Sequence, residues 1–164
     1  MRGGTPQFKH ITEATMICAF TGHRQLAASF NGALFRRALV NLIEICGADT
    51  FFDGMARGFD LLAATEIIDL KSQYKIKLVA CVPFGGQIQT MRPEDRKIYE
   101  RVIENCDDVK VLSADYYPGC MYARNRFMVD NADVVFAHFS GGSKGGTYYT
   151  VSYAKKYGKR IILI

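Results

Sequence analysis

The sequence lacks an apolar run long enough to cross a membrane, and it lacks the features of a secretory signal. Its longest apolar runs, such as Met16–Phe20 and Lys77–Val82, fall far short of the roughly 18 residues that a membrane helix needs. The N-terminal residues 1–13 contain no apolar stretch and include Glu13, unlike a signal peptide. These absences favour a cytoplasmic protein with no membrane partner.

The sequence also lacks a recognisable metal or disulfide pattern. Its 5 cysteines are an odd number, and no two of them form a Cys-x-x-Cys pair. Cys18 and Cys81 lie in apolar runs, where a free thiol behaves as a small hydrophobic group. The histidines His10, His23 and His138 are scattered along the chain. We therefore expect buried or incidental thiols and no metal site.

Several common catalytic motifs are missing. There is no G-x-x-x-x-G-K-[ST] motif, which excludes a P-loop ATPase, and no G-x-S-x-G nucleophile elbow. The first apolar run ends in TGHR rather than G-x-G-x-x-G, which disfavours NAD-dependent dehydrogenase chemistry. The net charge is +5, but the basic residues form no dense run. This charge is compatible with an anionic small ligand and also with weak nucleic-acid contact, and it establishes neither. Because no nucleic-acid-binding motif or basic tail is visible, we do not expect a nucleic-acid partner.

What the sequence does contain is a regular alternation of apolar runs and segments of helical spacing. The strands are expected at Met16–Thr21, Asp49–Asp53, Ile76–Val82, Val109–Ser113, Asp133–Phe139 and Arg160–Ile164. The helices are expected at Ser29–Cys46, Phe59–Ser72, from Pro93 onward, about Gly119–Asn131 and about Thr147–Tyr157. This order predicts one α/β domain, a doubly wound parallel sheet of about six strands with helices on both faces. The domain covers residues 16–164, after an N-terminal extension of residues 1–15.

The segments that follow the strands are candidates for a ligand site, because doubly wound sheets bind ligands at the carboxyl ends of their strands. Four of these five loops are rich in glycine or small polar residues. Glycine allows backbone N–H groups to approach an anion closely, and a helix N-terminus adds partial positive charge. The candidate ligand-binding residues are Thr21, Gly22, His23, Arg24, Gly54, Ala56, Gly58, Asp60, Pro83, Phe84, Gln87, Arg124, Asn125, Gly145, Gly146 and Thr147.

Some of these side chains have a second interpretation. Arg24 can hold a phosphate bidentately, or it can be a solvated arginine. His23 can hydrogen-bond a ribose or a phosphate, or it can bond to the local backbone. Asp60 can accept hydrogen bonds from ribose hydroxyls, but an acid in the first turn of a helix is also stabilising by itself. For Arg124, a surface salt bridge is the alternative.

Five segments in this order resemble the SLOG superfamily, and most closely its YpsA-like branch from bacteria and their phages. The segments read TGHR, DGMARGFDLLAATE, VPFGGQ, ARNRFMVDNADVV and GGTYYTVSYAKKYGKRIILI, and the resemblance covers about residues 16–164. It implies a Rossmann-like platform for nucleotides or nucleotide-derived ligands, in some members relatives of ADP-ribose. Homodimers are common in the superfamily, so a homodimer or higher homo-oligomer is compatible with the resemblance, although no residue here fixes an interface.

The superfamily includes the LOG phosphoribohydrolases, whose final loop and helix resemble P-G-G-x-G-T-x-x-E. Gly146 and Thr147 match the G-T of that motif, and Arg124 matches its arginine, but the glutamate position is Thr150. Threonine cannot act as a carboxylate acid or base. The remaining catalytic candidates are Asp60 and Glu66.

We therefore expect a protein that binds a nucleotide or NAD-derived ligand through a phosphate-binding loop and has no strong catalysis. It would act as a sensor, a sequestering protein or a regulatory module, with no obligatory cofactor. One alternative is a nucleotide N-glycosidase or phosphoribohydrolase. Another is a nucleic-acid-binding module like the DprA proteins of the same superfamily.

Overall fold

The computed structural model describes residues 15–164, so the predicted extension of residues 1–15 lies outside it except for Thr15. Strands and helices alternate along the whole described chain, as the sequence predicts. The elements are β1 (Met16–Gly22), α1 (Gly32–Glu44), β2 (Ala48–Asp53), α2 (Phe59–Leu70), β3 (Lys77–Val82), the 3-10 helix η1 (Gln87–Thr90), α3 (Pro93–Asn105), β4 (Asp108–Val111), α4 (Cys120–Asp130), β5 (Val134–His138), α5 (Gly146–Lys156) and β6 (Arg160–Leu163).

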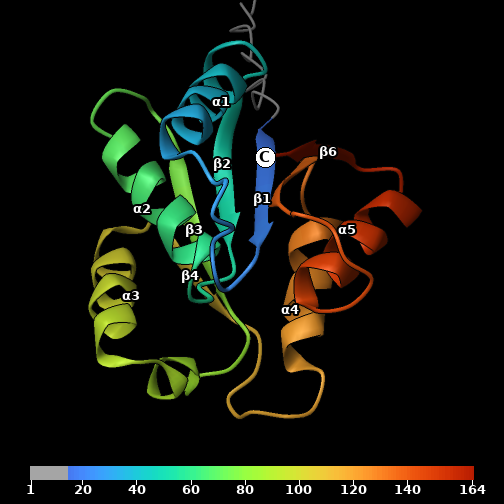
Figure 1. Ribbon diagram of the computed structural model, residues 1–164. Coiled ribbons are helices and arrows are strands. Elements are labelled where there is room, and N and C mark those ends of the chain that lie inside the picture. Colours follow the sequence, from blue (N-terminus) through green and yellow to red (C-terminus); the bar gives the residue numbers. More distant parts are fainter. Residues whose placement is uncertain (1–14) are drawn as a thin grey trace, which may run out of the picture.

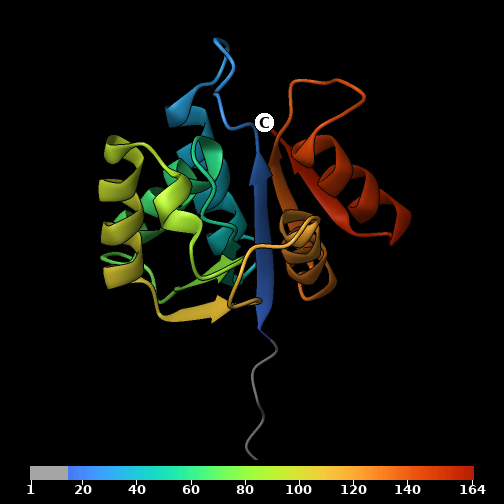
Figure 2. The ribbon, with the colours of Figure 1, turned by 90° about the horizontal axis from the view of Figure 1, so that it is seen from below.

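The strands form one six-stranded sheet in the order β4-β3-β2-β1-β5-β6, and every neighbouring pair is parallel. The predicted doubly wound α/β fold is confirmed. Figures 1 and 2 show α1, α2 and α3 on one face of the sheet and α4 and α5 on the other. This division follows from the strand order. The connections through α1, α2 and α3 run across the sheet toward β4, whereas those through α4 and α5 run toward β6, and right-handed crossovers in opposite directions place their helices on opposite faces.

The core lies mainly between the sheet and α1–α3. Alternate residues of β1 point to opposite faces, so Cys18 and Phe20 join the large cluster with α1 and α2, while Ala19 joins a smaller cluster beneath α4. Phe20 stacks on Phe51 of β2 with ring centroids 5.7 Å apart. Phe59, the first residue of α2, packs edge-on against Phe20 at 6.2 Å. These contacts fix the start of α2 against the carboxyl end of β1.

The helix ends follow the local sequence signals. The side chain of Asn31 accepts a hydrogen bond from the backbone N–H of Leu34 (3.1 Å), and α1 therefore begins at Gly32 rather than at the predicted Ser29. Pro93 occupies the first turn of α3, as expected. The sequence did not predict η1, whose four residues are too few to show a helical period. Among the described residues, no helix is long and apolar enough to span a membrane.

Candidate functional site

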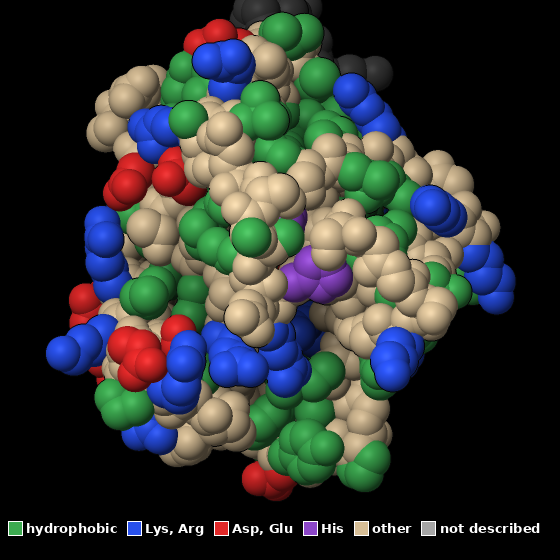
Figure 3. All heavy atoms as spheres, in the orientation of Figure 1, with side chains coloured by type: hydrophobic (Ala, Val, Ile, Leu, Met, Phe, Trp, Pro, Cys, Tyr) green, Lys and Arg blue, Asp and Glu red, His purple; other side chains and the backbone are tan. Residues whose placement is uncertain are grey.

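The candidate site lies at the carboxyl edge of the sheet, where β1 has β2 on one side and β5 on the other. The chain leaves β1 toward one face and leaves β5 toward the other, which opens a crevice between the two loops. A cavity of about 490 Å³ occupies this position. Figure 3 shows Lys and Arg side chains gathered below a histidine near the middle of the face that contains this edge.

The structure brings most of the predicted ligand-binding residues together around this cavity. Those that line it are Thr21, Gly22, His23, Arg24, Ala56, Asp60, Arg124, Asn125, Gly145, Gly146 and Thr147. Phe84 and Gln87 line a second cavity beside it. Gly54, Gly58 and Pro83 line neither cavity.

His23 connects the loop after β1 to the loop after β5. Its Nε2 accepts a hydrogen bond from the backbone N–H of Ser140 (3.0 Å) and lies 3.1 Å from the Ser140 Oγ. Burial and the neighbouring His138 lower the pKa of His23, which keeps Nε2 available as an acceptor near neutral pH. His23 therefore bonds to the backbone of a distant loop rather than to the local backbone, and its side chain also lines the cavity.

Gly58 lies in a close packing contact and lines neither cavity. Its φ is +83°, and a Cβ atom built on it would lie 2.3 Å from the backbone oxygen of Arg24. The next residue, Phe59, donates its backbone N–H to the carbonyl oxygen of His23 (3.1 Å). Gly58 thus lets the start of α2 pack directly on the loop after β1.

Glu66 does not reach the site. It lies on the second turn of α2 and forms an ion pair with Arg36 of α1, with 2.7 Å between Arg36 Nη1 and Glu66 Oε2. It lines neither cavity. The α1–α2 contact holds the Glu66 side chain away from the crevice, so the structure does not bring this catalytic candidate together with the other predicted site residues.

A buried cluster of charged groups lies behind the cavity, at the carboxyl end of β2. Asp53, Asp60 and Arg124 are 0%, 7% and 4% exposed. Arg124 reaches across from α4 and donates from Nη1 to the carbonyl oxygens of Gly54 and Cys81. A Cβ on Gly54 would lie 2.8 Å from the Arg124 guanidinium carbon, so this glycine makes room for the arginine. The alternative interpretation of Arg124, a surface salt bridge, does not describe this buried side chain.

Burial changes the protonation of the two carboxyls. It raises the pKa of Asp53 well above the usual value, and the nearby Asp60 raises it further. Burial also raises the pKa of Asp60 from 3.8 to about 6, against the opposite effects of Arg124 and the backbone N–H of Ala56. Asp53 Oδ1 accepts from the backbone N–H of Met55 (2.8 Å), whereas its Oδ2 has no partner. The cluster therefore places a carboxyl that titrates near neutral pH, Asp60, in the wall of the cavity.

We expect Asp60→Asn to remove part of the pH dependence of stability. A carboxyl whose pKa is raised by folding stabilises the protein when protonated, and this stabilisation is lost as the pH rises from about 4 through 6. A shift from 3.8 to about 6 corresponds to ~3 kcal/mol. Urea unfolding measures the free energy of unfolding at pH 4 and pH 7. Between these pH values, this free energy should fall by about this much more in the wild type than in the variant. Asp115→Asn, at an exposed aspartate, is the control, and an Asp60→Asn variant that keeps the wild-type pH dependence would contradict this assignment.

The structure adds residues that sequence analysis missed. The loop between β4 and α4 contributes Tyr116 and Gly119 to the cavity, and the loop before α5 contributes Lys144. The first turn of α4 adds Cys120, Met121 and Tyr122. Sequence analysis did not select the β4–α4 loop, whose single glycine is Gly119, because it sought loops rich in glycine or small polar residues. Asp53 was also missed, although a charged residue at the end of a buried strand is a visible signal of an unusual site.

The start of α5 presents backbone atoms, and no carboxylate, to the cavity. Gly145, Gly146 and Thr147 line the cavity, and a Cβ on Gly146 would meet nothing within 4 Å. Thr150, at the position of the LOG glutamate, is 3% exposed and donates its hydroxyl to the carbonyl oxygen of Gly146 (2.8 Å). Within residues 15–164, no group of His, Cys, Asp or Glu side chains is arranged to hold a metal ion. The arrangement can thus hold an anion through backbone N–H groups and nearby cations.

Solved structures with the same fold come from DNA processing protein A. The protein from Helicobacter pylori has 21% sequence identity and a TM-score of 0.63, over 90% of this chain and 64% of its own. The protein from Streptococcus pneumoniae has 18% identity and a TM-score of 0.62, over 91% of this chain and 50% of its own. A third structure, TM1055, has 17% identity and a TM-score of 0.55, over 90% of this chain and 72% of its own. At these identities the likeness shows a shared fold.

Sequence comparison identifies relatives and a family. UPF0398 proteins from Bacillus cereus and Bacillus thuringiensis are 27% identical over 105 residues, which is 62% of this chain and 57% of theirs. The match therefore spans little more than half the length of these relatives. The family model YpsA, described as the YspA SLOG family, matches residues 14–162. The predicted resemblance is confirmed: the chain belongs to the YspA SLOG family.

Proposed function

We propose that this protein binds a nucleotide or an NAD-derived ligand in the cavity between β1 and β5. The observation that carries the proposal is the composition of the cavity wall, in which the start of α5 lies with Arg24 and Lys144. Backbone N–H groups at a helix N-terminus attract anions, and both cations are exposed. A volume of about 490 Å³ falls in the usual range for small-molecule sites, about 300–1,000 Å³.

The rest of the wall suits the other parts of such a ligand. Asn125 and Asp60 offer hydrogen-bonding groups for ribose hydroxyls, and Tyr116 and Tyr122 offer aromatic faces. Asn125 Oδ1 accepts from Arg124 Nε (2.7 Å), which leaves its amide N–H groups for a ligand. In this proposal the phosphate lies at the start of α5, and the sugar lies toward α2 and α4.

The proposed role is binding without strong catalysis, as in a sensor, a sequestering protein or a regulatory module. Hydrolysis of the LOG type needs a carboxylate where this chain has Thr150, and the Thr150 hydroxyl is engaged by the Gly146 carbonyl. We expect tight binding and no product.

Two variants test the phosphate position. Arg24→Ala removes a cation from the cavity wall, and a charge-assisted hydrogen bond contributes roughly 1.5–3 kcal/mol, so ADP-ribose or AMP should bind about tenfold to a hundredfold more weakly. Gly146→Val places a side chain in open space at the cavity and should also weaken binding at least about tenfold. Isothermal titration calorimetry measures both affinities.

The matched control is Arg37→Ala, which removes the same charge from an exposed position on α1 that lines neither cavity. Its affinity should equal that of the wild type. If Arg24→Ala and Gly146→Val both bind as tightly as Arg37→Ala, the ligand does not occupy this cavity.

One observation favours a second candidate function, a nucleotide N-glycosidase. Asp60 lines the cavity and its pKa is about 6, which suits a general acid or base near neutral pH. Incubation with AMP, ADP-ribose and NAD, followed by chromatography for released base or ribose phosphate, separates the two candidates. Turnover that disappears in Asp60→Asn would replace the binding proposal with the enzyme.

A nucleic-acid partner is tested by the same binding assays. The Helicobacter pylori DNA processing protein A is described with a single-stranded DNA binding mode, and the fold is shared. The net charge of +5 and the absence of a basic run still favour a small anionic ligand. Binding of single-stranded DNA that weakens steeply with salt, with no binding of nucleotides, would favour the nucleic-acid partner.

A further inference from the structure

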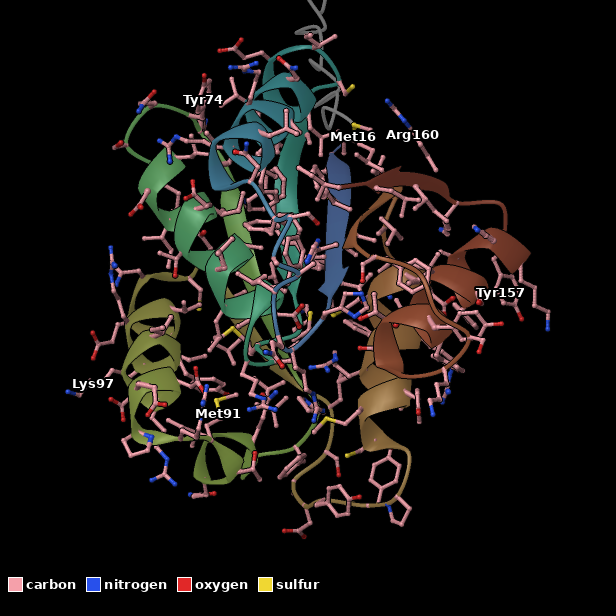
Figure 4. All side chains as sticks on the ribbon, viewed as in Figure 1. Met16, Tyr74, Met91, Lys97, Tyr157 and Arg160 are labelled. Carbon is pink, nitrogen blue, oxygen red and sulfur yellow. The ribbon has the colours of Figure 1, made fainter. Side chains whose placement is uncertain are left out.

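A second cavity of about 380 Å³ adjoins the first one. The two cavities share Arg24, Ala56, Tyr116 and Met121 as wall residues, so they lie side by side along the carboxyl edge of the sheet. The second cavity lies toward the segment that joins β3 to α3. Figure 4 shows Met91, one of its wall residues, just before α3 on this same edge of the molecule.

The wall of the second cavity contains cations and no acidic residue. Its cations are Arg24, Arg57 and Arg92. Arg92 lies 3.3 Å from Glu94 and 3.2 Å from Asp95, so its charge is already compensated. Within residues 15–164, no carboxylate pairs with Arg24 or Arg57. This part of the edge therefore offers two exposed arginines for further negative charge.

The remaining wall is apolar and aromatic. Phe84 and Tyr116 meet edge to face, with ring centroids 5.4 Å apart, and the thioethers of Met91 and Met121 lie in the same wall. Aromatic rings and methionine sulfur both pack favourably against a planar ring. The second cavity thus combines an arginine-lined part with a surface for a flat group.

Gln87 adds a specific polar signal. It is 2% exposed and lines the second cavity. Its Nε2 donates to the carbonyl oxygen of Gly54 (3.2 Å), while its Oε1 has no partner. A buried acceptor without a partner costs free energy, and a ligand with an N–H donor, such as an amino-substituted base or a carboxamide, would satisfy it.

We propose that the natural ligand has two halves joined by a pyrophosphate, as in a dinucleotide, and that its second ring occupies the second cavity. One phosphate lies at the start of α5 beside Arg24, and Arg24, which faces both cavities, also contacts the other phosphate. Arg57 adds positive charge beside the pyrophosphate, and Gln87 Oε1 accepts a hydrogen bond from the second ring. This inference rests on the proposed function, because it extends the ligand that the first cavity holds.

The test compares AMP, ADP and NAD by isothermal titration calorimetry. These probes carry one phosphate, a pyrophosphate, and a pyrophosphate with a second ring. We expect affinity to rise along the series, with NAD at least about tenfold tighter than AMP. Two variants change the second cavity alone: Arg57→Ala removes a cation, and Met91→Trp fills the space. Both should weaken NAD binding about tenfold or more and leave AMP binding unchanged, whereas Arg37→Ala should change neither.

The outcomes separate this inference from the proposed function. AMP that binds as tightly as NAD overturns the two-part ligand and leaves the first cavity as a mononucleotide site. NAD that binds tightly to Arg57→Ala and to Met91→Trp overturns the assignment of the second cavity. If none of the three compounds binds the wild type, both the proposed function and this inference fail.

Discussion

Gly58→Ala is expected to destabilise the protein by about 3 kcal/mol. A residue with a side chain pays about 1–2 kcal/mol for a left-handed backbone, and Gly58 has φ +83°. The new Cβ would also lie 2.3 Å from the Arg24 carbonyl oxygen and 2.7 Å from that of His23, and overpacking typically costs about 1–3 kcal/mol. The midpoint of urea unfolding measures the effect.

The control for Gly58 is Gly32→Ala, the same change at the start of α1. A Cβ on Gly32 meets nothing within 4 Å, so this variant should be as stable as the wild type or slightly more stable. Equal stability of the two variants would show that the loops after β1 and β2 do not need their close contact. Because Gly58→Ala changes the fold, a loss of ligand binding in that variant would say nothing about the ligand.

Arg124→Ala should have an effect of similar size that depends on pH. Arg124 is 4% exposed and donates to two buried carbonyl oxygens, and its charge opposes the raised pKa of Asp60. Removing one member of a buried charged cluster costs about 3–5 kcal/mol, and we expect ~3 kcal/mol at pH 7. Urea unfolding of variant and wild type at pH 5 and pH 8 measures the change.

The sign of the pH dependence follows from the carboxyls that Arg124 compensates. Without the arginine, the pKa of Asp60 moves further above its usual value, so the protein loses more stability as the pH rises past 6. The destabilisation should therefore be smaller at pH 5 than at pH 8. Arg37→Ala, at an exposed site, should stay within about 0.5 kcal/mol of the wild type at both pH values. A loss that is equal at pH 5 and pH 8 would mean that Arg124 acts through its hydrogen bonds alone.

These two residues show why the best probes of binding lie elsewhere. Gly58 and Arg124 hold the loops after β1 and β2 in place, so their variants alter the site through the fold. Arg24 and Gly146 both line the cavity. The Arg24 side chain is exposed, and a Cβ atom on Gly146 would meet nothing within 4 Å. Substitutions there change the ligand's surroundings without removing a buried contact.

The sequence by itself determined the fold class, the order of the elements and the edge of the sheet that carries the site. Short continuous apolar runs that alternate with segments of helical spacing indicate the strands of a parallel sheet, and parallel strands bring all their following loops to one edge. The loops after β1 and β5, with His23, Arg24 and Gly146, were found on this basis and line one cavity.

Only the tertiary structure decided which residue of each loop faces the cavity. Gly58 faces the Arg24 backbone, Glu66 pairs with Arg36, and Arg124 is buried against Gly54. Contacts between segments far apart in the chain decide whether a loop residue is buried in packing or faces the cavity. No local sequence pattern encodes those contacts. For the same reason the raised pKa of Asp60 and the second cavity beside Gln87 emerge only when β2, β3 and α4 come together.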